Sequence, residues 1–392
     1  MLCKPSNSTN STVRVGMPPA WGPSPTAATS YFPPFLTCHC GQMRVLIIGG
    51  GLGGLGLAQG LEKNGVEATV FERDRTLTAR PQGYRLHVDS RAADALRQCL
   101  PPDLYDLFEQ TTSRPSHRVT VLTPQLKTLK TIETGPGFST SVDRLTLREI
   151  LSTGLPDLRF GAQFTHYEPR NGTIRAHFAD GTSADGDLLV GADGIGSRVR
   201  SQYLPHARIV DTGTRCVYGR TPLAAVEDRL PAPLRDGFCP VTDRRGLGLA
   251  LGLVQFRTKP SALGLTAHED YVMWSLAARG SRLDQEPADL IRTWHPDLRN
   301  LIDRATPEAT FEIRIRTSKP VRPWTPTAVT LLGDAIHAMP PSRGSGANLA
   351  LFDAATLCTR LTDIGGYEDV MRRVGFAAVR GPRSYWPRWF RR

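Results

Sequence analysis

A run of closely spaced glycines near residue 50 has the spacing of a nucleotide-binding turn. Gly49, Gly51 and Gly54 form the pattern Gly-x-Gly-x-x-Gly, and Glu72 follows 23 residues after Gly49. In such a turn one glycine allows the tight bend, the next lets a pyrophosphate approach the backbone, and the third lets helix and strand pack closely. The amino end of the following helix would face the phosphates, and the Glu72 carboxylate would accept hydrogen bonds from ribose hydroxyls. The pattern predicts a dinucleotide site.

Two further segments place an aspartate at the tip of an apolar strand. Asp193 stands in Gly-Ala-Asp-Gly after one such strand, and Asp334 stands in Gly-Asp-Ala after another. Ionised carboxylates at these places need partners, and ribose or ribityl hydroxyls are suitable donors. Gly344 and Gly346, near the start of a predicted helix, offer backbone that can approach a flavin ring and stabilise charge near its N1 and O2. Together these segments favour FAD as the dinucleotide.

The elements that would position these residues follow from the hydrophobic patterns. A first β-α-β unit is predicted from residues 44–48, 55–64 and 68–72, with Gly65 ending its helix. Further helices are predicted at 90–99, 143–153, 195–203, 346–362 and 367–379, and further strands at 118–123, 158–169, 173–179, 186–191 and 328–333. Between about 206 and 322, alternating stretches with Pro-rich connections indicate a mostly β region.

The predicted fold class is α/β, with an α+β organisation in two domains. A discontinuous FAD-binding domain with a Rossmann-like βαβ three-layer architecture would cover residues 43–205 and 323–365, and a β-sheet-rich substrate domain, 206–322, would be inserted in it. Residues 366–392 would form a C-terminal helix and a basic tail. Residues 1–42 are rich in Ser, Thr, Pro and Ala without an apolar period, so we expect a disordered leader or a misplaced gene start.

Charge, hydropathy and cysteine usage exclude several classes of protein. The net charge of +11 resides mainly in the two ends, because residues 1–42 and 371–392 contain no acidic residue, and no basic face for nucleic acid remains. The longest apolar run, 246–254, is far short of the roughly 20 residues of a transmembrane helix. The seven cysteines form no CxxC pair, so we expect no metal site, reduced thiols and a cytoplasmic location.

The motifs together resemble those of the class A FAD-dependent monooxygenases of the para-hydroxybenzoate hydroxylase type. The segments that match are GGGLGG at 49–54, GADG at 191–194 and GDAIHAMPPSRGSGAN at 333–348. Residues 82–89 (QGYRLHVD) and 141–145 (SVDRL) look like the family's flavin-side strand and its FAD-contacting arginine segment. The resemblance covers about residues 43–380. It extends to bacterial and fungal enzymes that hydroxylate polyketide-like or other fused-ring secondary metabolites.

The resemblance implies a role for each matched position. Arg144 would contact FAD, Asp334 would hold its ribityl or phosphate region, and Asp193 would serve FAD and a transient NAD(P)H. Arg80 is a candidate for an NAD(P)H phosphate contact, and a solvated surface role is an equal alternative for it. The cofactor-binding residues implied are Gly49, Gly51 and Gly54 at the pyrophosphate, Glu72 at the adenosine ribose, Arg144, Asp193, Asp334, and Gly346 and Ala347 beside the isoalloxazine.

The implied reaction uses NAD(P)H and O2 to hydroxylate an aromatic or polyketide-like small molecule through a flavin C4a-hydroperoxide, in secondary-metabolite biosynthesis. A side-chain base would deprotonate a phenol, and His87, Tyr218 and Arg220 are the candidates, although a structural role is the more expected one for each. His337 is expected to pack a turn. Epoxidation, Baeyer–Villiger oxygenation on the same scaffold, and a flavin-binding protein without turnover remain open as alternatives.

Overall fold

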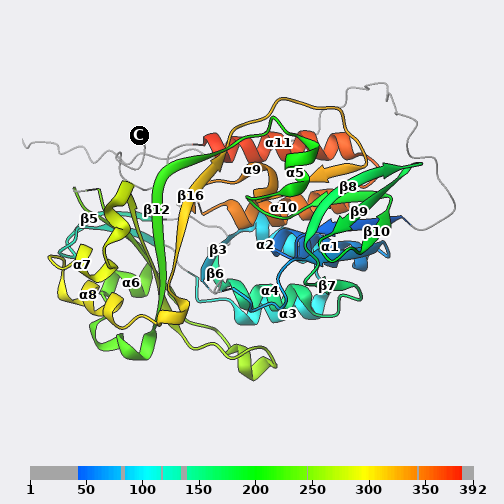
Figure 1. Ribbon diagram of the computed structural model, residues 1–392. Coiled ribbons are helices and arrows are strands. Elements are labelled where there is room, and N and C mark those ends of the chain that lie inside the picture. The colour runs from blue at the N-terminus through cyan, green and yellow to red at the C-terminus, as the bar shows by residue number, and fades with distance from the viewer. Residues whose placement is uncertain are drawn as a thin grey trace, which may run out of the picture. The chain divides into compact units, whose positions relative to one another are not determined.

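The computed structural model describes residues 43–80, 84–115, 118–133, 139–244, 246–341 and 344–381, all within one compact unit. The predictions for residues 1–42 and for the basic tail at 382–392 lie outside the described residues, as do residues 82, 83, 342 and 343 of the matched motifs. Helices and strands follow one another along the chain, and the strands form both parallel and antiparallel sheets (Figure 1). The predicted α/β fold class is therefore confirmed.

A parallel sheet of five strands contains the predicted β-α-β unit. Its strands, in the spatial order β17-β11-β1-β2-β7, are Val329–Leu331, Leu188–Gly191, Arg44–Ile48, Glu67–Glu72 and Leu158–Phe160. The apolar runs of β17, β11, β1 and β2 are buried, as expected of a parallel sheet that is covered on two sides, whereas the edge strand β7 is partly exposed. Because β17 pairs with β11, a segment near residue 330 completes a sheet that begins at residue 44.

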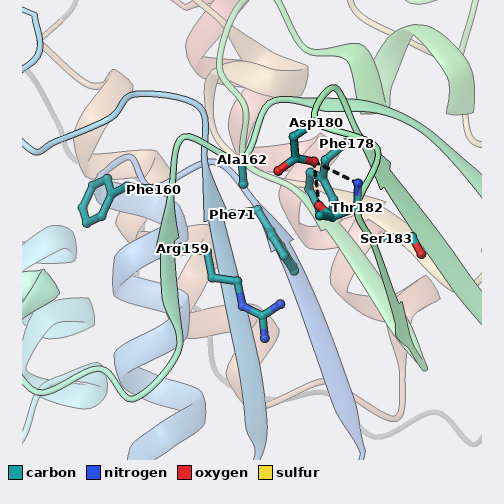
Figure 2. Close-up of a pocket in the computed structure, with 8 residues that line it drawn as sticks. All are labelled: Phe71, Arg159, Phe160, Ala162, Phe178, Asp180, Thr182 and Ser183. Atoms are coloured by element: carbon teal, nitrogen blue, oxygen red, sulfur yellow. Dashed lines mark hydrogen bonds between the residues drawn. The ribbon is translucent and has the colours of Figure 1, made fainter.

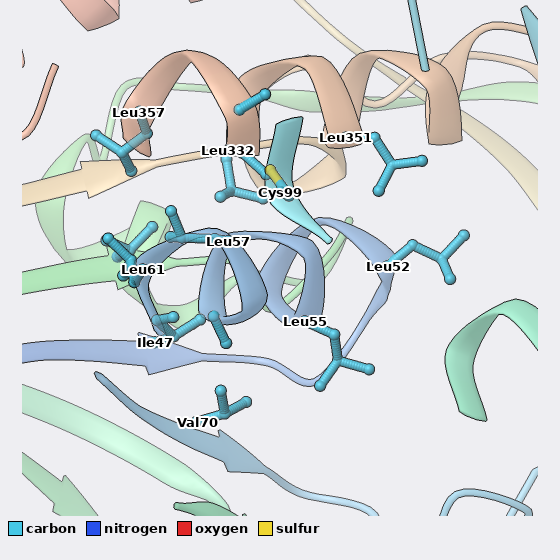
Figure 3. Close-up of a cluster of buried hydrophobic side chains, with 14 of the residues drawn as sticks. Ile47, Leu52, Leu55, Leu57, Leu61, Val70, Cys99, Leu332, Leu351 and Leu357 are labelled. Atoms are coloured by element: carbon cyan, nitrogen blue, oxygen red, sulfur yellow. The ribbon is translucent and has the colours of Figure 1, made fainter. Parts of the chain in front are cut away.

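Helices cover one face of this sheet, and a small antiparallel sheet covers the other. Helix α1 (Leu52–Lys63) packs between Ile47 and Val70 of the strands and the leucines of α10 (Gly346–Cys358), as Figure 3 shows. Beside α10 lies α2 (Ser90–Cys99). The small sheet consists of β8 (Phe164–Arg170), β9 (Thr173–Phe178) and β10 (Ser183–Gly186). Its Phe178 stacks on Phe71 of β2 at 4.4 Å, which completes the three layers.

A second, seven-stranded sheet contains the alternating segments of residues 206–322. In the order β16-β12-β15-β14-β13-β4-β5, its strands are Phe311–Ser318, Ile209–Pro222, Tyr271–Arg279, Gly248–Val254, Gly237–Thr242, Arg118–Leu122 and Thr128–Glu133. All neighbours are antiparallel except β13 and β4. Strands β4 and β5 precede residue 206 in the chain, so this sheet also recruits a hairpin from outside the predicted insertion.

The two faces of the seven-stranded sheet have different partners. Alternate residues such as Val217, Leu251 and Trp274 pack under the short helices α6 (Ala232–Asp236), α7 (Pro287–Leu290) and α8 (Pro296–Asp303). The residues between them, including Tyr218, Tyr271 and Met273, cluster with Tyr84 on the opposite face. This second face, which we call the ribbon face, contacts the two-stranded ribbon of β3 (Arg85–Asp89) and β6 (Ser139–Asp143).

Other helices and turns connect these sheets. The remaining α-helices of the described residues are α3 (Pro102–Thr111), α4 (Arg144–Ser152), α5 (Arg198–Tyr203), α9 (Asp334–His337) and α11 (Ile364–Arg380). Short 3₁₀ helices are found at Leu223–Ala225, Glu227–Arg229, Pro260–Leu263, Gly280–Asp284 and Pro307–Ala309. In the part of the chain that the structure covers, no helix combines the length and apolarity needed to cross a membrane.

Several predicted boundaries were wrong, for local reasons. The strand predicted at 158–169 is divided into β7 and β8, because Gly161 takes a left-handed turn with φ of 74°. Helix α5 starts at residue 198 instead of 195, since the Ser197 side chain caps it. Helix α11 begins at Ile364, where Asp363 accepts from the Gly366 amide, and α10 already ends at Cys358. The sequence patterns missed α3, α6, α7 and α8.

Candidate functional site

The glycine turn after β1 has the geometry that each predicted glycine role requires. Gly49 has a φ of 115°, and an added Cβ would lie 2.4 Å from the Ala192 carbonyl oxygen. At Gly54 an added Cβ would lie 2.0 Å from the Gly49 oxygen, so helix and strand approach too closely for any side chain. An added Cβ at Gly51 meets nothing within 4 Å, and no side chain of the described residues caps α1. The amino end of α1 is thus open to a phosphate.

Glu72 ends β2 with a buried carboxylate that the protein itself binds. Its Oε2 accepts hydrogen bonds from the Gly50 amide at 2.9 Å and from the Arg148 guanidinium at 3.1 Å, and its Oε1 accepts from the Asp74 amide. Arg148 also donates to the Gly50 carbonyl, so this ion pair holds the turn in shape. The sequence patterns missed Arg148, although its position four residues after Arg144 puts both on one face of α4. The ribose contact of Glu72 stays a prediction.

Asp334 follows β17 at the start of α9, with its side chain exposed to solvent. Surrounding protein nevertheless desolvates the carboxyl and raises its pKa, against the opposing effects of His337 and Arg144. An added Cβ at Gly346 would be 3.7 Å from the Asp334 Oδ1, so the start of α10 lies next to this carboxylate. These residues fit a bound cofactor with hydroxyl donors.

Asp193, at the tip of β11, has one oxygen in use and one without a partner. Its Oδ2 accepts from the backbone amides of Arg198 and Val199 at 2.7 and 3.3 Å, which holds the start of α5. Its Oδ1 is shielded from solvent and has no donor among the described residues. Burial raises the pKa of this carboxyl. An orphaned acceptor of this kind fits a hydroxyl donor from a ligand, and contact with FAD or NAD(P)H stays a prediction.

Asn348 joins the start of α10 to β3, which brings two of the matched motifs together. Its side-chain amide donates to the carbonyls of His87 and Gly344 at 2.9 and 2.8 Å, and its oxygen accepts from the Asp89 amide at 3.0 Å. Gly346 and Ala347, in the first turn of α10, therefore lie beside the predicted flavin-side strand. The position of Asn348 inside the glycine-rich motif was the only sequence signal for its role.

His337 packs inside the protein, as the sequence predicted. Its Nε2 lies 2.6 Å from the Asp353 Oδ2, which also accepts from the Gly333 amide at 2.9 Å. Burial lowers the pKa of His337, but the Asp353 carboxylate outweighs this effect and the net shift is upward. The pair fixes the turn that carries Asp334, and the sequence patterns gave no sign of Asp353.

The three candidate bases differ in their chemistry. Burial raises the pKa of Tyr218 well above its ordinary value, so its phenol stays protonated. Arg220 lies over the Tyr271 ring at 4.2 Å, and a guanidinium does not act as a base at neutral pH. Burial, and then Arg85, lower the pKa of His87, so its imidazole is neutral and can accept a proton. Among the three, only His87 keeps the properties of a base.

Arg80 forms a surface ion pair and also borders a pocket. Its Nε and Nη2 donate to the Asp74 Oδ2 at 2.8 and 2.5 Å. The pocket, of about 410 Å³, lies between residues 78–80 and the seven-stranded sheet; besides Arg80, its charged lining residues are Arg220, Glu269, Asp270 and Glu308. Two of these carboxylates, Glu269 and Asp270, are paired with Lys259, so the charges around the pocket are mixed and do not select a phosphate. The NAD(P)H contact of Arg80 therefore stays a prediction, next to its observed surface role.

Two other places could hold a ligand and contain none of the predicted residues. Figure 2 shows a pocket of about 280 Å³ beside Phe71 and Phe178, where Asp180 accepts from the amide and hydroxyl of Thr182. On β8 and β9, His166, Glu168 and His177 bring potential metal-ligand atoms within 4.8 Å. The two imidazole rings are parallel to within 4°, so their in-plane lone pairs do not converge on one ion.

Comparisons with known proteins agree with these features. A family model described as an FAD binding domain matches residues 42–365. The dual O-methyltransferase/FAD-dependent monooxygenase elcB of Phaeosphaeria nodorum is 34% identical over 390 residues, covering 84% of this chain and 42% of its own length. The FAD-dependent monooxygenase cctM of Talaromyces islandicus is 30% identical over 321 residues, covering 80% and 81%. The chain thus spans less than half of the bifunctional relative.

A solved structure extends the likeness to three dimensions. The crystal structure described as that of an FAD-containing monooxygenase from Photorhabdus luminescens has a TM-score of 0.76 and 30% identity, covering 86% of this chain and 96% of that chain. The matched region includes the glycine turn, Asp193 and Asp334. The predicted resemblance to the class A flavin monooxygenases is confirmed, and the chain belongs to the FAD binding domain family.

Proposed function

We propose that this chain is an FAD-dependent monooxygenase that uses NAD(P)H and O2 to hydroxylate an aromatic or polyketide-like molecule. The observation that carries the proposal is that the start of α10 lies next to Asp334 and, through Asn348, next to β3, whose ribbon contacts a sheet face rich in aromatic residues. The names of the fungal relatives, monooxygenases at 30% identity or more, support the same reaction class. The bifunctional relative contains a further activity and is longer than this chain, so nothing of its other half is carried over.

The residues of this chain would divide the task between cofactor and substrate. The open amino end of α1 at Gly51 would hold the pyrophosphate, and Arg144, Asp193 and Asp334 would bind the remaining polar groups of FAD. Backbone at Gly346 and Ala347 would lie beside the isoalloxazine. When bound, FAD supplies the two-electron redox chemistry and the activation of O2, and the protein supplies orientation and exclusion of water.

The substrate would lie between the β3–β6 ribbon and the ribbon face of the seven-stranded sheet. Tyr84, Tyr218 and Phe311 form one aromatic cluster there, with ring centroids 5.4 to 6.2 Å apart. Such a wall favours a flat apolar ring system and keeps water out. Neutral His87, on the same ribbon, would accept the proton of a phenol and so raise the electron density of the ring.

The proposal is tested by the origin of the oxygen atom in the product. The FAD-loaded protein is incubated with NADPH or NADH and a panel of phenols and fused-ring polyketides under ¹⁸O₂. A monooxygenase gives substrate-dependent NAD(P)H oxidation and a product 16 mass units heavier with ¹⁶O₂ and 18 with ¹⁸O₂. An epoxide product would show epoxidation instead of hydroxylation, and a lactone product would show Baeyer–Villiger oxygenation. NAD(P)H oxidation that no substrate accelerates would contradict the proposal.

Cytoplasmic location is a further part of the proposal. It rests on the thiols: Cys99, Cys216, Cys239 and Cys358 are all free. Microscopy of a fluorescent fusion of the protein checks it, and a signal confined to another compartment would contradict it.

A further inference from the structure

The small antiparallel sheet brings two histidines and a glutamate together on one face. His166 of β8 lies directly opposite His177 of β9, and Glu168 follows two residues after His166, so the three side chains share one face of the sheet. Their candidate ligand atoms all lie within 4.8 Å of one another. The opposite face of this sheet packs on the parallel sheet, through residues such as Phe178. The cluster therefore lies on the outer side of the small sheet, and it contains none of the residues proposed to bind FAD.

The hydrogen bonds of Thr165 determine which nitrogen of His166 carries the hydrogen. The Thr165 hydroxyl donates its only hydrogen to the His177 carbonyl at 3.0 Å. At the His166 Nδ1, 3.1 Å away, the same hydroxyl can only accept, so this nitrogen carries a hydrogen. In the neutral imidazole the lone pair is then on Nε2, which lies 3.7 Å from the Glu168 Oε1. A lone pair and a carboxylate oxygen repel each other unless a cation lies between them.

The other two groups of the cluster also lack a partner outside it. The His177 Nε2 is shielded from solvent, has no hydrogen-bond partner among the described residues, and lies 3.5 Å from the Glu168 Oε2. Arg175 lies opposite Glu168 in the strand pair, but its guanidinium donates two hydrogen bonds to Asp185 instead. Among the described residues, only the two imidazoles lie close enough to Glu168 to form an ion pair with it. Two ring nitrogens and one carboxylate thus face a common space.

The separations within the cluster are close to those of ligand atoms around a zinc ion. Zinc binds imidazole nitrogen and carboxylate oxygen at about 2.0–2.2 Å in a tetrahedron, which places two ligand atoms roughly 3.4 Å apart. The two nitrogen-to-oxygen distances here are 3.5 and 3.7 Å. Because the two rings are parallel, with centroids 4.5 Å apart, one ring has to turn about its Cβ–Cγ bond before both lone pairs reach one ion. This torsion is soft, and the His166 side chain is 52% exposed, so His166 has room to turn.

We propose that His166, Glu168 and His177 form a zinc site that links β8 to β9, with water as the fourth ligand. Two imidazoles and one carboxylate are a ligand set that zinc prefers, whereas Mg²⁺ and Ca²⁺ prefer oxygen ligands alone. Because the ligands come from both strands of the pair, the ion binds the folded sheet more tightly than the unfolded chain and so stabilises it. The cysteine spacing that predicted no metal site does not bear on these histidines. The inference is independent of the proposed function.

The test measures the zinc that the FAD-loaded, full-length protein retains after dialysis against Zn²⁺ at neutral pH. We expect about one more zinc ion per chain in the unaltered protein than in His177→Ala or Glu168→Gln. Cysteines elsewhere in the chain can also bind zinc, but they are the same in all of these proteins, so the difference reports the cluster. His206→Ala, which removes an exposed histidine outside the cluster, should bind as much zinc as the unaltered protein.

A second measurement tests the link between the two strands. Zn²⁺ should raise the melting temperature of the unaltered protein and of His206→Ala relative to that of Glu168→Gln, and Mg²⁺ should not. Without metal, Glu168→Gln should melt like the unaltered protein, because its side chain is half exposed.

The proposal is overturned if the unaltered protein binds no more zinc than His177→Ala, since a proton alone would then lie between the imidazoles and the carboxylate. Equal zinc binding by Glu168→Gln and the unaltered protein would also overturn it, because the carboxylate would not be a ligand. So would zinc that binds at the cluster without raising the melting temperature relative to Glu168→Gln, because the ion would not link the strands.

Discussion

At the scale of single residues, the candidate site contains two kinds of charged group: a buried ion pair and two carboxyls that could accept hydrogen bonds from a ligand. Glu72 and Arg148 are both buried, and both bind the backbone of Gly50 in the glycine turn. The surrounding protein raises the pKa values of Asp334 and Asp193, and the Asp193 Oδ1 accepts no hydrogen bond in the described part of the chain. We expect the Glu72–Arg148 ion pair to contribute to the stability of the fold, and Asp334 and Asp193 to contribute to cofactor affinity.

The Glu72–Arg148 pair predicts a large loss of stability when one partner is removed. Arg148→Met leaves the Glu72 carboxylate buried without its cation, so the free energy of unfolding should fall by about 3–5 kcal/mol. Arg229→Met, at an exposed arginine, should change it by less than about 1 kcal/mol. Urea unfolding of the FAD-loaded proteins measures both. Equal stability of the two variants would show that the turn does not need the pair.

Asp334 predicts a loss of cofactor without a loss of fold. Asp334→Ala removes an acceptor for cofactor hydroxyls. Because the Asp334 side chain is exposed to solvent, the stability of the protein without FAD should change by no more than about 0.5 kcal/mol. FAD affinity should fall by about tenfold or more. The control is Asp303→Ala, at an exposed position of α8. Unchanged flavin content in Asp334→Ala would remove Asp334 from the site.

At the scale of elements, the two strands of the β3–β6 ribbon are each followed directly by a helix. Strand β3 leads into α2 and β6 leads into α4, and in each case an aspartate at the junction caps the helix. The caps Asp89 and Asp143 are therefore fixed by local sequence, and Tyr271 of the seven-stranded sheet donates to Asp143. Helix α11 contacts β17 of the parallel sheet, where Glu368 accepts a hydrogen bond from the Thr330 hydroxyl at 2.9 Å.

Glu368 predicts a pH dependence of stability at the contact between α11 and β17. Burial raises the pKa of Glu368 to about 7, from an ordinary value of 4.5. A raised pKa means that the folded state holds the proton more tightly, so this contribution to stability is complete below pH 4.5 and is lost as pH rises to 7. Relative to Glu368→Gln, the unaltered protein should lose up to about 3 kcal/mol between pH 4.5 and 8. Parallel pH profiles of unfolding for the two proteins would contradict this.

At the scale of the whole molecule, the sequence predicts what depends on local pattern and misses what depends on distant partners. The β-α-β unit, the glycine turn and the strand-end aspartates were predicted, because each is encoded within a few neighbouring residues. Arg148, Asn348 and Asp353 bind residues that lie 76, 261 and 16 positions away in the chain, and these contacts could not be predicted from the local patterns. Helices α6, α7 and α8 are short, and prolines open them within a β-rich stretch, so no helical period could form.

The identity of the flavin released by the purified protein tests the central claim most directly. The glycine turn and the open amino end of α1, which Glu72 holds in shape, are the features that we expect to bind the pyrophosphate of a dinucleotide. We predict a yellow protein with the two visible absorption bands of oxidised flavin, which releases FAD on heating at close to one equivalent per chain. Release of FMN, or a colourless protein that does not take up added FAD, would contradict the account.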